Sequence, residues 1–149
     1  MVTIKHGDLL EASEDIIAHQ VNCFGIAGGL AADIFEKWPD AENDYLQMCQ
    51  RANPWALRGL AQVTGQQKDG HIICNLFGQY QPGADYNPVA LESALWKLSE
   101  IAGCMGKSVA LPFGLSCGIA GGTWSEVQKI IESTMKGVQC TIYMKVDAE

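Results

Sequence analysis

Two glycine-rich segments, almost a hundred residues apart, offer the clearest chemistry in this sequence. The first spans residues 22–31 and the second spans residues 116–124. Each segment follows an apolar run typical of a strand and precedes a segment with helical periodicity. Glycine lets backbone N–H groups approach an oxyanion without an intervening Cβ, and a helix N-terminus adds partial positive charge. The pattern therefore predicts two anion-binding turns.

Two such turns in one short chain indicate a single ligand that is held from both sides. A diphosphate has the size and charge that such a pair of turns can hold through main-chain amides. Asn22 is the first polar residue after a buried run, so we expect its side chain at the mouth of the cleft. Ser116 can add a hydroxyl group to the same region.

Composition limits the classes of function that remain. The chain has 149 residues and a formal net charge of −7, with 48% hydrophobic and 18% charged residues. We expect one domain with a buried core, no membrane span and a cytoplasmic location, since the N-terminus lacks a signal-peptide pattern. The net negative charge argues against nonspecific binding of a nucleic-acid backbone, but not against binding of a nucleotide. We expect the six cysteines to be reduced, and no spacing suggests a metal site.

Periodicity predicts strands that alternate with helices, the signature of an α/β fold. Such sheets bind ligands beyond the carboxyl ends of their strands, where both glycine turns begin. We expect residues 78–88, with their proline and glycine, to form a loop beside the cleft. We expect Asp40 to cap the second helix. The expected strands are residues 2–5, 16–21, 59–64, 71–77, 108–113 and 140–144, and the other helices are residues 29–37, 87–104 and 124–135.

Four segments in order resemble the macro domain family. They are Gly7-Asp8-Leu9, the first glycine turn with Val21 before it, Asn75-Leu76-Phe77-Gly78-Gln79, and Leu111-Pro112 with the second glycine turn and Trp124. The resemblance covers essentially the whole chain. It implies a three-layer α/β/α sandwich with a six-stranded mixed sheet that binds ADP-ribose or a derivative, without a cofactor and as a monomer.

The resemblance also implies roles for individual residues. Asp8, with Leu9 beside it, matches the position that accepts a hydrogen bond from the adenine amino group. Asn22 matches the contact to the distal ribose. The turns that wrap the distal ribose and the diphosphate correspond here to Gly25, Gly28, Gly29, Leu30 and Ala31, and to Ser116, Cys117, Gly118, Ile119, Ala120 and Gly121. The run Ala27-Gly28-Gly29 is one residue shorter than the methionine-glycine-x-glycine run of many relatives.

Within the family, His19 and the residues around it resemble the ADP-ribose 1″-phosphate phosphatases, where the matching histidine is implicated in catalysis. The branch that removes ADP-ribose from glutamates uses a lysine and an aspartate, and Gln79 and Ala120 stand at those positions here. We therefore favour phosphatase activity. Hydrolysis of ADP-ribosyl esters, including O-acetyl-ADP-ribose, and binding without catalysis are the alternatives.

Several of these residues also have a purely structural interpretation. His19 lies on a strand that alternates faces, so it points either into the core or toward the cleft. Phe77 and Tyr80 either stack on the ligand as a lid or belong to the core. Cys23 and Cys117 lie in the glycine turns, where a thiolate nucleophile is conceivable but small packing residues are also common.

Overall fold

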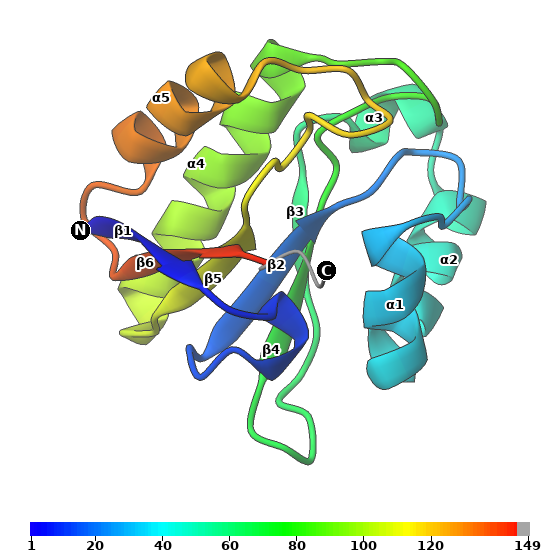
Figure 1. The fold of residues 1–149 in the computed structure, drawn as a ribbon. Coiled ribbons are helices and arrows are strands. Elements are labelled where there is room, and N and C mark those ends of the chain that lie inside the picture. Colours follow the sequence, from blue (N-terminus) through cyan, green and yellow to red (C-terminus); the bar gives the residue numbers. More distant parts are fainter. Residues whose placement is uncertain (146–149) are drawn as a thin grey trace.

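A six-stranded mixed sheet lies at the centre of this computed structural model, which describes residues 1–145 (Figure 1). The strand order is β1-β6-β5-β2-β4-β3, and every neighbouring pair is parallel except β3 with β4. The strands are β1 (Val2–His6), β2 (Ile16–Gln20), β3 (Ala61–Val63), β4 (Ile72–Leu76), β5 (Val109–Pro112) and β6 (Cys140–Met144).

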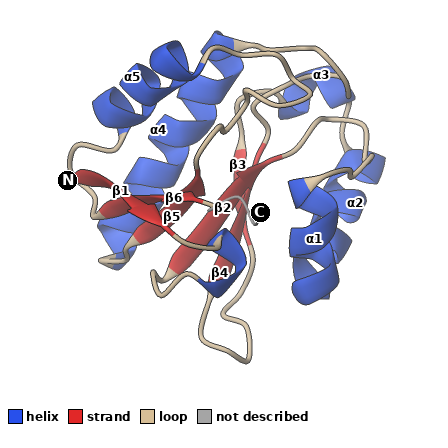
Figure 2. Cartoon of the chain, viewed as in Figure 1, coloured by secondary structure: helices blue, strands red, loops and turns tan. Residues whose placement is uncertain are grey.

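Helices cover both faces of the sheet, which makes three layers (Figure 2). On one face lie α1 (Leu30–Lys37) and α2 (Pro39–Arg51), and on the other lie α4 (Pro88–Met105) and α5 (Trp124–Thr134). Two short elements complete the chain, the 3₁₀ helix η1 (Leu9–Glu11) and α3 (Pro54–Leu57). The predicted α/β/α sandwich with a six-stranded mixed sheet is confirmed.

Alternation along the central strands builds two separate cores. In β2, Ile16 and Ala18 pack against α4 and α5, whereas Ile17 points to the opposite face against α1 and α2. These three side chains are fully buried, as expected for a parallel strand covered on both sides. The face on which a β2 side chain lies is therefore fixed by its position along the strand.

Local signals fix the ends of the helices that border the site. Pro88 occupies the first turn of α4, the Asn87 side chain accepts a hydrogen bond from Ala90 N–H, and Gly106 closes the helix at φ 65°. Pro39 similarly begins α2, so Trp38 is the capping residue. The expectation that Asp40 caps this helix is wrong, because Asp40 already lies in the first turn.

Sequence periodicity predicted the long elements but not the single-turn ones. Neither η1 nor α3 spans enough residues to show a repeat. A capping side chain precedes each, Asp8 or Asn53, and Pro54 also marks the first turn of α3. Strand β3 is shorter than expected, since Gly59 adopts φ 78° and the chain turns there. Within residues 1–145, none of the helices has the length and apolar composition that a membrane crossing requires.

Candidate functional site

Two adjoining cavities, of about 170 and 350 Å³, form one cleft at the carboxyl ends of β2 and β5. They share Gln20 and Gln79 on the floor, Gly28 and Ala31 from the first glycine turn and the start of α1, and Ile119 from the second turn. The two glycine-rich segments therefore face each other across a single opening. This is the arrangement that their sequence pattern predicted.

The first turn presents main-chain donors to the cleft. Ile26, Ala27 and Gly28 line it. Ile26 N–H is directed to the Tyr45 hydroxyl, whereas within residues 1–145 the N–H groups of Ala27 and Gly28 have no hydrogen-bond acceptor. Gly29 follows at φ 54°, a conformation that side chains disfavour, and precedes α1 without any side-chain cap. The N-terminal amides of α1 are consequently left free beside Leu30 and Ala31, which also line the cleft.

The second turn presents a matching set. The N–H groups of Gly118, Ile119 and Ala120 likewise have no acceptor among the described residues, and all three residues line the larger cavity. Ser116 adopts φ 67°, unusual for a residue with a side chain, and its carbonyl accepts from Gly122 N–H at 2.8 Å. A Cβ at position 122 would lie only 2.6 Å from that carbonyl oxygen, so this close turn requires glycine.

A chain of side-chain hydrogen bonds forms the floor between the turns. The Ser116 hydroxyl donates to Gln20 Oε1 at 2.9 Å, and Gln20 Nε2 donates to Gln79 Oε1 at 2.7 Å. Gln79 Nε2 donates in turn to the carbonyl oxygens of Gln81 at 2.7 Å and Gly83 at 3.2 Å. The second glycine turn, β2 and the 78–88 loop are therefore held together beneath the cleft.

Tyr45 of α2 fixes the other end of the cleft. Its hydroxyl lies 2.8 Å from the Asn22 carbonyl oxygen and 2.9 Å from Asn22 Oδ1, and it accepts from Gly25 N–H at 3.1 Å. Asn22 Oδ1 also accepts from Phe24 N–H, while Asn22 Nδ2 donates to the Ile26 carbonyl at 2.7 Å. One amide proton of Asn22 remains for a ligand. Burial raises the pKa of Tyr45, so its hydroxyl is protonated at neutral pH.

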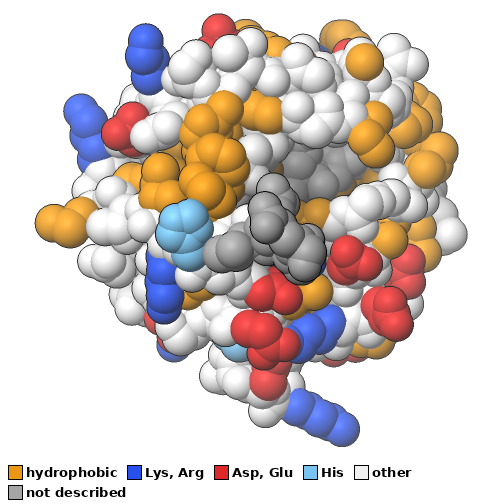
Figure 3. All heavy atoms as spheres, in the orientation of Figure 1, with side chains coloured by type: hydrophobic (Ala, Val, Ile, Leu, Met, Phe, Trp, Pro, Cys, Tyr) orange, Lys and Arg blue, Asp and Glu red, His pale blue; other side chains and the backbone are white. Residues whose placement is uncertain are grey.

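The lining of the cleft is almost free of ionisable groups. Of the described residues that line the two cavities, Tyr45 alone can titrate, and none is an acid, a lysine, an arginine or a histidine. The face drawn in Figure 3 likewise shows no contiguous basic patch among its described residues. Within residues 1–145, no group of histidine, cysteine and acidic side chains is placed to hold a metal ion. The cleft therefore presents neutral main-chain dipoles, which can hold an anion without a charged side chain.

Most of the predicted turn residues line the cleft, and a smaller group supports it from outside. The lining residues are Asn22, Gly28, Gly29, Leu30, Ala31, Ser116, Gly118, Ile119 and Ala120. Gly25 is bonded to Tyr45, Gly121 N–H donates to the Gly118 carbonyl, and the Cys117 thiol donates to the Leu115 carbonyl. These three hold the shapes of the turns and do not line the cavities.

His19 does not reach the cleft, which removes the basis for its predicted catalytic role. It alternates with Gln20, shares the face of Ile17, and packs edge-on against Phe35 of α1 with ring centroids 5.2 Å apart. Only 1% of its surface is exposed. The strand position that points into the cleft is therefore the neighbouring Gln20.

Asn75 determines which ring nitrogen of the neutral His19 carries the proton. The Asn75 amide nitrogen lies 3.1 Å from the Ala41 carbonyl and 3.1 Å from Gln62 Oε1, both acceptors, so Asn75 Oδ1 must face His19. His19 Nε2–H donates to that oxygen at 2.7 Å, which leaves Nδ1 without a proton or a partner. Burial lowers the pKa of His19 to about 4, against the opposing effect of the Asn75 hydrogen bond.

For Phe77, Cys23 and Cys117, the structure supports the purely structural interpretation. Phe77 is fully buried and packs against Tyr45, so it belongs to the core and cannot be a lid. Tyr80 lies half-exposed beside the cleft but does not line either cavity. Desolvation raises the pKa of the Cys23 thiol to about 12 and also raises the pKa of Cys117. Neither thiol is activated as a nucleophile.

Asp8 and Leu9 lie outside the two cavities. The Asp8 carboxylate accepts from Leu10 N–H at 2.9 Å and caps η1, while Leu9 is buried in the core beneath α1. Because η1 packs beside β5, Asp8 lies toward the end of the cleft where Pro112 and Phe113 line the larger cavity. Its second oxygen has no hydrogen-bond partner among the described residues.

Sequence reasoning missed several residues that shape the cleft. Gln20 could have been found from strand parity, since it lies two residues before Asn22 and opposite in phase to His19. Gln79 was considered only for chemistry that it cannot perform, not as a floor residue. Tyr45 carries no local signal, because only the packing of α2 brings it to the turn. The other lining residues were not named individually, although Ile26 and Ala27 lie in the predicted first turn and Pro82 and Gly83 in the predicted loop; the rest are Val21, Pro112, Phe113, Gly114 and Leu115.

Comparison with known proteins places this cleft in a family, although no family model matches the chain. An ADP-ribose 1″-phosphate phosphatase of Saccharomyces cerevisiae is 23% identical, and the alignment covers 95% of this chain and 97% of the yeast protein. A DNA ADP-ribosyl glycohydrolase of Thermus aquaticus is 25% identical over 99% of this chain, which spans only 42% of that protein.

The macrodomain of Mycobacterium tuberculosis DarG superimposes with a TM-score of 0.84 at 26% identity, covering 96% of this chain and 97% of that one. The four-segment resemblance, the strand order and the two facing glycine turns agree with this match. The chain therefore has the macrodomain fold and is similar in sequence to macro domain proteins.

The buried neutral histidine predicts a specific dependence of stability on pH. The folded state holds His19 at a pKa of about 4 and the unfolded chain at about 6.5, so stability falls as pH drops below 6.5. The loss from this group reaches about 3 kcal/mol near pH 4. His19→Gln keeps a donor to Asn75 but does not titrate, so it lacks this component. Urea unfolding of both proteins between pH 7 and 4 measures the difference; parallel curves would refute the assignment.

Proposed function

We propose that the cleft binds ADP-ribose, or a derivative that carries a group on its distal ribose. The observation that carries the proposal is a set of five N–H groups without an acceptor among the described residues, at Ala27 and Gly28 and at Gly118, Ile119 and Ala120, on opposite walls. A diphosphate supplies enough anionic oxygens to accept from both walls at once. Most of these residues are exposed, so water can pair with the donors in the free protein, and a diphosphate would replace that water with stronger, charge-assisted hydrogen bonds.

The two ends of the cleft suit the two ends of this ligand. The larger cavity, with Pro112 and Phe113 at its border, takes the adenosine, and the smaller one, beside Asn22 and Tyr45, takes the distal ribose. The remaining amide proton of Asn22 is available to a ribose hydroxyl. In the same orientation, the free oxygen of Asp8 accepts from the adenine amino group, as the family resemblance implies.

Substitutions in the turns test the diphosphate site directly. A Cβ at Gly28 or Gly118 enters open space and neither residue has a positive φ, so Gly28→Glu and Gly118→Glu should fold normally. The added carboxylate would repel the diphosphate, and we expect affinity for ADP-ribose to fall about a hundredfold or more by calorimetry. Gly137→Glu, also in open space but outside both cavities, is the matched control and should bind as the wild type does. Unchanged affinity in both turn variants would rule out this site.

A second substitution tests the adenine contact. Asp8→Asn keeps an oxygen that can cap η1 but replaces the second oxygen with a donor, which faces the donor of the adenine amino group. We expect affinity for ADP-ribose to fall about tenfold, with affinity for the inosine analogue of ADP-ribose reduced less. An equal loss for both nucleotides would mean that Asp8 acts only through the 3₁₀ helix.

We further propose that the protein releases phosphate from ADP-ribose 1″-phosphate. The similarity to the yeast phosphatase extends over 97% of that protein and favours this activity above the others. His19 is buried, so the reaction must rely on positioning and main-chain donors, with water as the nucleophile and the turns stabilising negative charge. Removal of ADP-ribose through a lysine is disfavoured, since no lysine lines the described cleft.

A panel of substrates distinguishes these activities. We expect phosphate release from ADP-ribose 1″-phosphate but not from a general phosphomonoester, and His19→Gln should retain it. Loss of turnover in His19→Gln with binding intact would return the histidine to the mechanism. Turnover of O-acetyl-ADP-ribose in place of the 1″-phosphate would identify an ester hydrolase, and tight binding without any turnover would identify a binding module.

A further inference from the structure

Strand β1 lies at one edge of the sheet, and its inner side alone is hydrogen-bonded. The Cys140 N–H donates to the Met1 carbonyl at 2.9 Å, and the Gly7 N–H donates to the Met144 carbonyl at 3.0 Å. These two bonds bracket the parallel pairing with β6, which is unbroken over residues 2–6. Main-chain groups alternate in direction along a strand, so the odd-numbered residues of β1 are the ones bonded to β6.

The even-numbered residues of β1 therefore turn their main-chain groups outward. The N–H and C=O groups of Val2, Ile4 and His6 have no hydrogen-bond partner within residues 1–145. They form a row of donors and acceptors with the spacing of a β-ladder. A row of this kind along a sheet edge is a template for a further strand.

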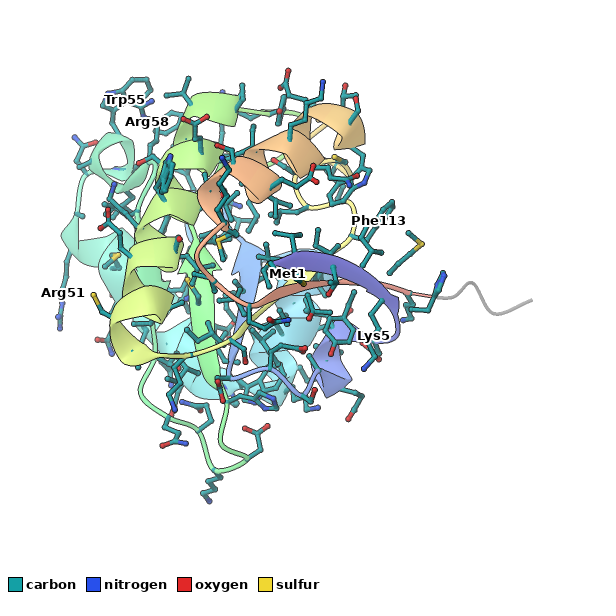
Figure 4. All side chains as sticks on the ribbon, turned by 90° about the vertical axis from the view of Figure 1, so that its left-hand side faces the viewer. Met1, Lys5, Arg51, Trp55, Arg58 and Phe113 are labelled. Carbon is teal, nitrogen blue, oxygen red and sulfur yellow. The ribbon has the colours of Figure 1, made fainter. Side chains whose placement is uncertain are left out.

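This edge lacks the features that usually block such pairing. Every residue from 3 to 6 is exposed, and Ile4 exposes 45% of its surface. The strand has neither a proline nor a break in register, and Lys5 folds back so that its Nζ lies 5.7 Å from the centre of the Tyr143 ring. Figure 4 looks onto this edge, where β1 runs from Met1 toward Lys5 with none of the described helices in front of it. The described part of the chain therefore leaves room for a neighbouring strand.

A second copy of β1 matches this row of donors and acceptors. In an antiparallel pair centred on Ile4, that residue faces Ile4 of the second copy, and Val2 faces His6. Residues that face each other with outward groups exchange both of their hydrogen bonds. Every outward donor and acceptor of the two strands is then paired. Because each strand is already extended within its own sheet, pairing costs little conformational entropy.

Charge and burial favour this register over its neighbours. Centring the pair on Lys5 would place two lysines opposite each other, and centring it on Thr3 would leave His6 unpaired. In the register centred on Ile4, Lys5 faces Thr3 of the second copy. Val2 packs against the core beneath α4 and α5, so Ile4 shares that face of the sheet. The two Ile4 side chains then bury apolar surface against each other at the centre of the pair.

We propose that β1 pairs with β1 of a second copy of this chain, so that two sheets join into one across a two-fold axis. The proposal departs from the monomer that the family resemblance implies, and it is independent of what the cleft binds. A single pair of strands is a small interface. We therefore expect a dissociation constant in the micromolar range, on the order of 10–100 µM.

Sedimentation equilibrium of the intact chain and of two variants tests the interface. Ile4→Pro removes an outward N–H but no bond to β6, and proline is tolerated on a sheet edge, so the variant should fold. Loss of the two central hydrogen bonds, each contributing a factor of about five, should weaken the dimer about thirtyfold or more. Ile4→Val keeps the N–H and a branched apolar side chain, so this matched control should dimerise nearly as well as the wild type.

Amide hydrogen exchange of the wild type adds a measurement that a general change in stability would not reproduce. Above the dissociation constant, the N–H groups of Val2, Ile4 and His6 should exchange slowly, and dilution should restore fast exchange. The N–H groups of Thr3 and Lys5, which are bonded to β6, should exchange slowly at every concentration. This alternation from residue to residue is specific to pairing on the outer side of β1.

A dimer that Ile4→Pro weakens and Ile4→Val preserves, with protection of the outward amides that depends on concentration, supports the proposal. A chain that remains monomeric at millimolar concentration overturns it, as does an undiminished dimer of an Ile4→Pro variant whose thermal unfolding shows that it is folded. Protection that does not change on dilution would mean that a segment of the same chain covers the edge, which also overturns it. If Ile4→Pro does not fold, the exchange of the wild-type amides decides alone.

Discussion

The composition of the cleft depends on main-chain N–H groups that have no acceptor among the described residues. These groups are concentrated where β2 and β5 end. Donors of this kind are normally paired, and leaving several of them unpaired on two facing walls is stable only where solvent or an anion can reach them. The lining is therefore open to solvent and consists largely of small residues, many of them glycines. Peptide dipoles supply partial positive charge to the cleft, so neither lysine nor arginine is required there.

Strand alternation then decides which side chains can take part. A single step along β2 separates Gln20, at the floor of the cleft, from His19, sealed against Phe35. The sequence shows two polar residues side by side, and the sheet assigns them opposite environments. The buried member keeps its uncharged form because burial disfavours the charged ring, and Asn75 accepts its one ring proton, so its contribution is to packing and to the pairing of β2 with β4.

The long elements, the order of layers and the convergence of the two turns were all predictable, because they depend on periodicity and on glycine spacing. What could not be predicted depends on contacts between distant segments. Tyr45 reaches Asn22 only after α2 docks, and Phe77 is core because Tyr45 packs beside it. Asp8 was predicted from family resemblance, and its geometry adds a capping role that the resemblance does not contain. The ring contacts of Tyr80 with Phe24 and Trp55 join α3 to two loops, so no local pattern predicts them.

The hydrogen-bonded floor that runs from Ser116 through Gln20 to Gln79 has a mechanical consequence. Because the Gln20 amide is bonded to both Ser116 and Gln79, neither the second glycine turn nor the 78–88 loop can move outward without breaking a hydrogen bond. The second glycine turn and the 78–88 loop therefore move together. A ligand that contacts only one of these segments must order both, so a ligand that spans the cleft gains more than the sum of its halves.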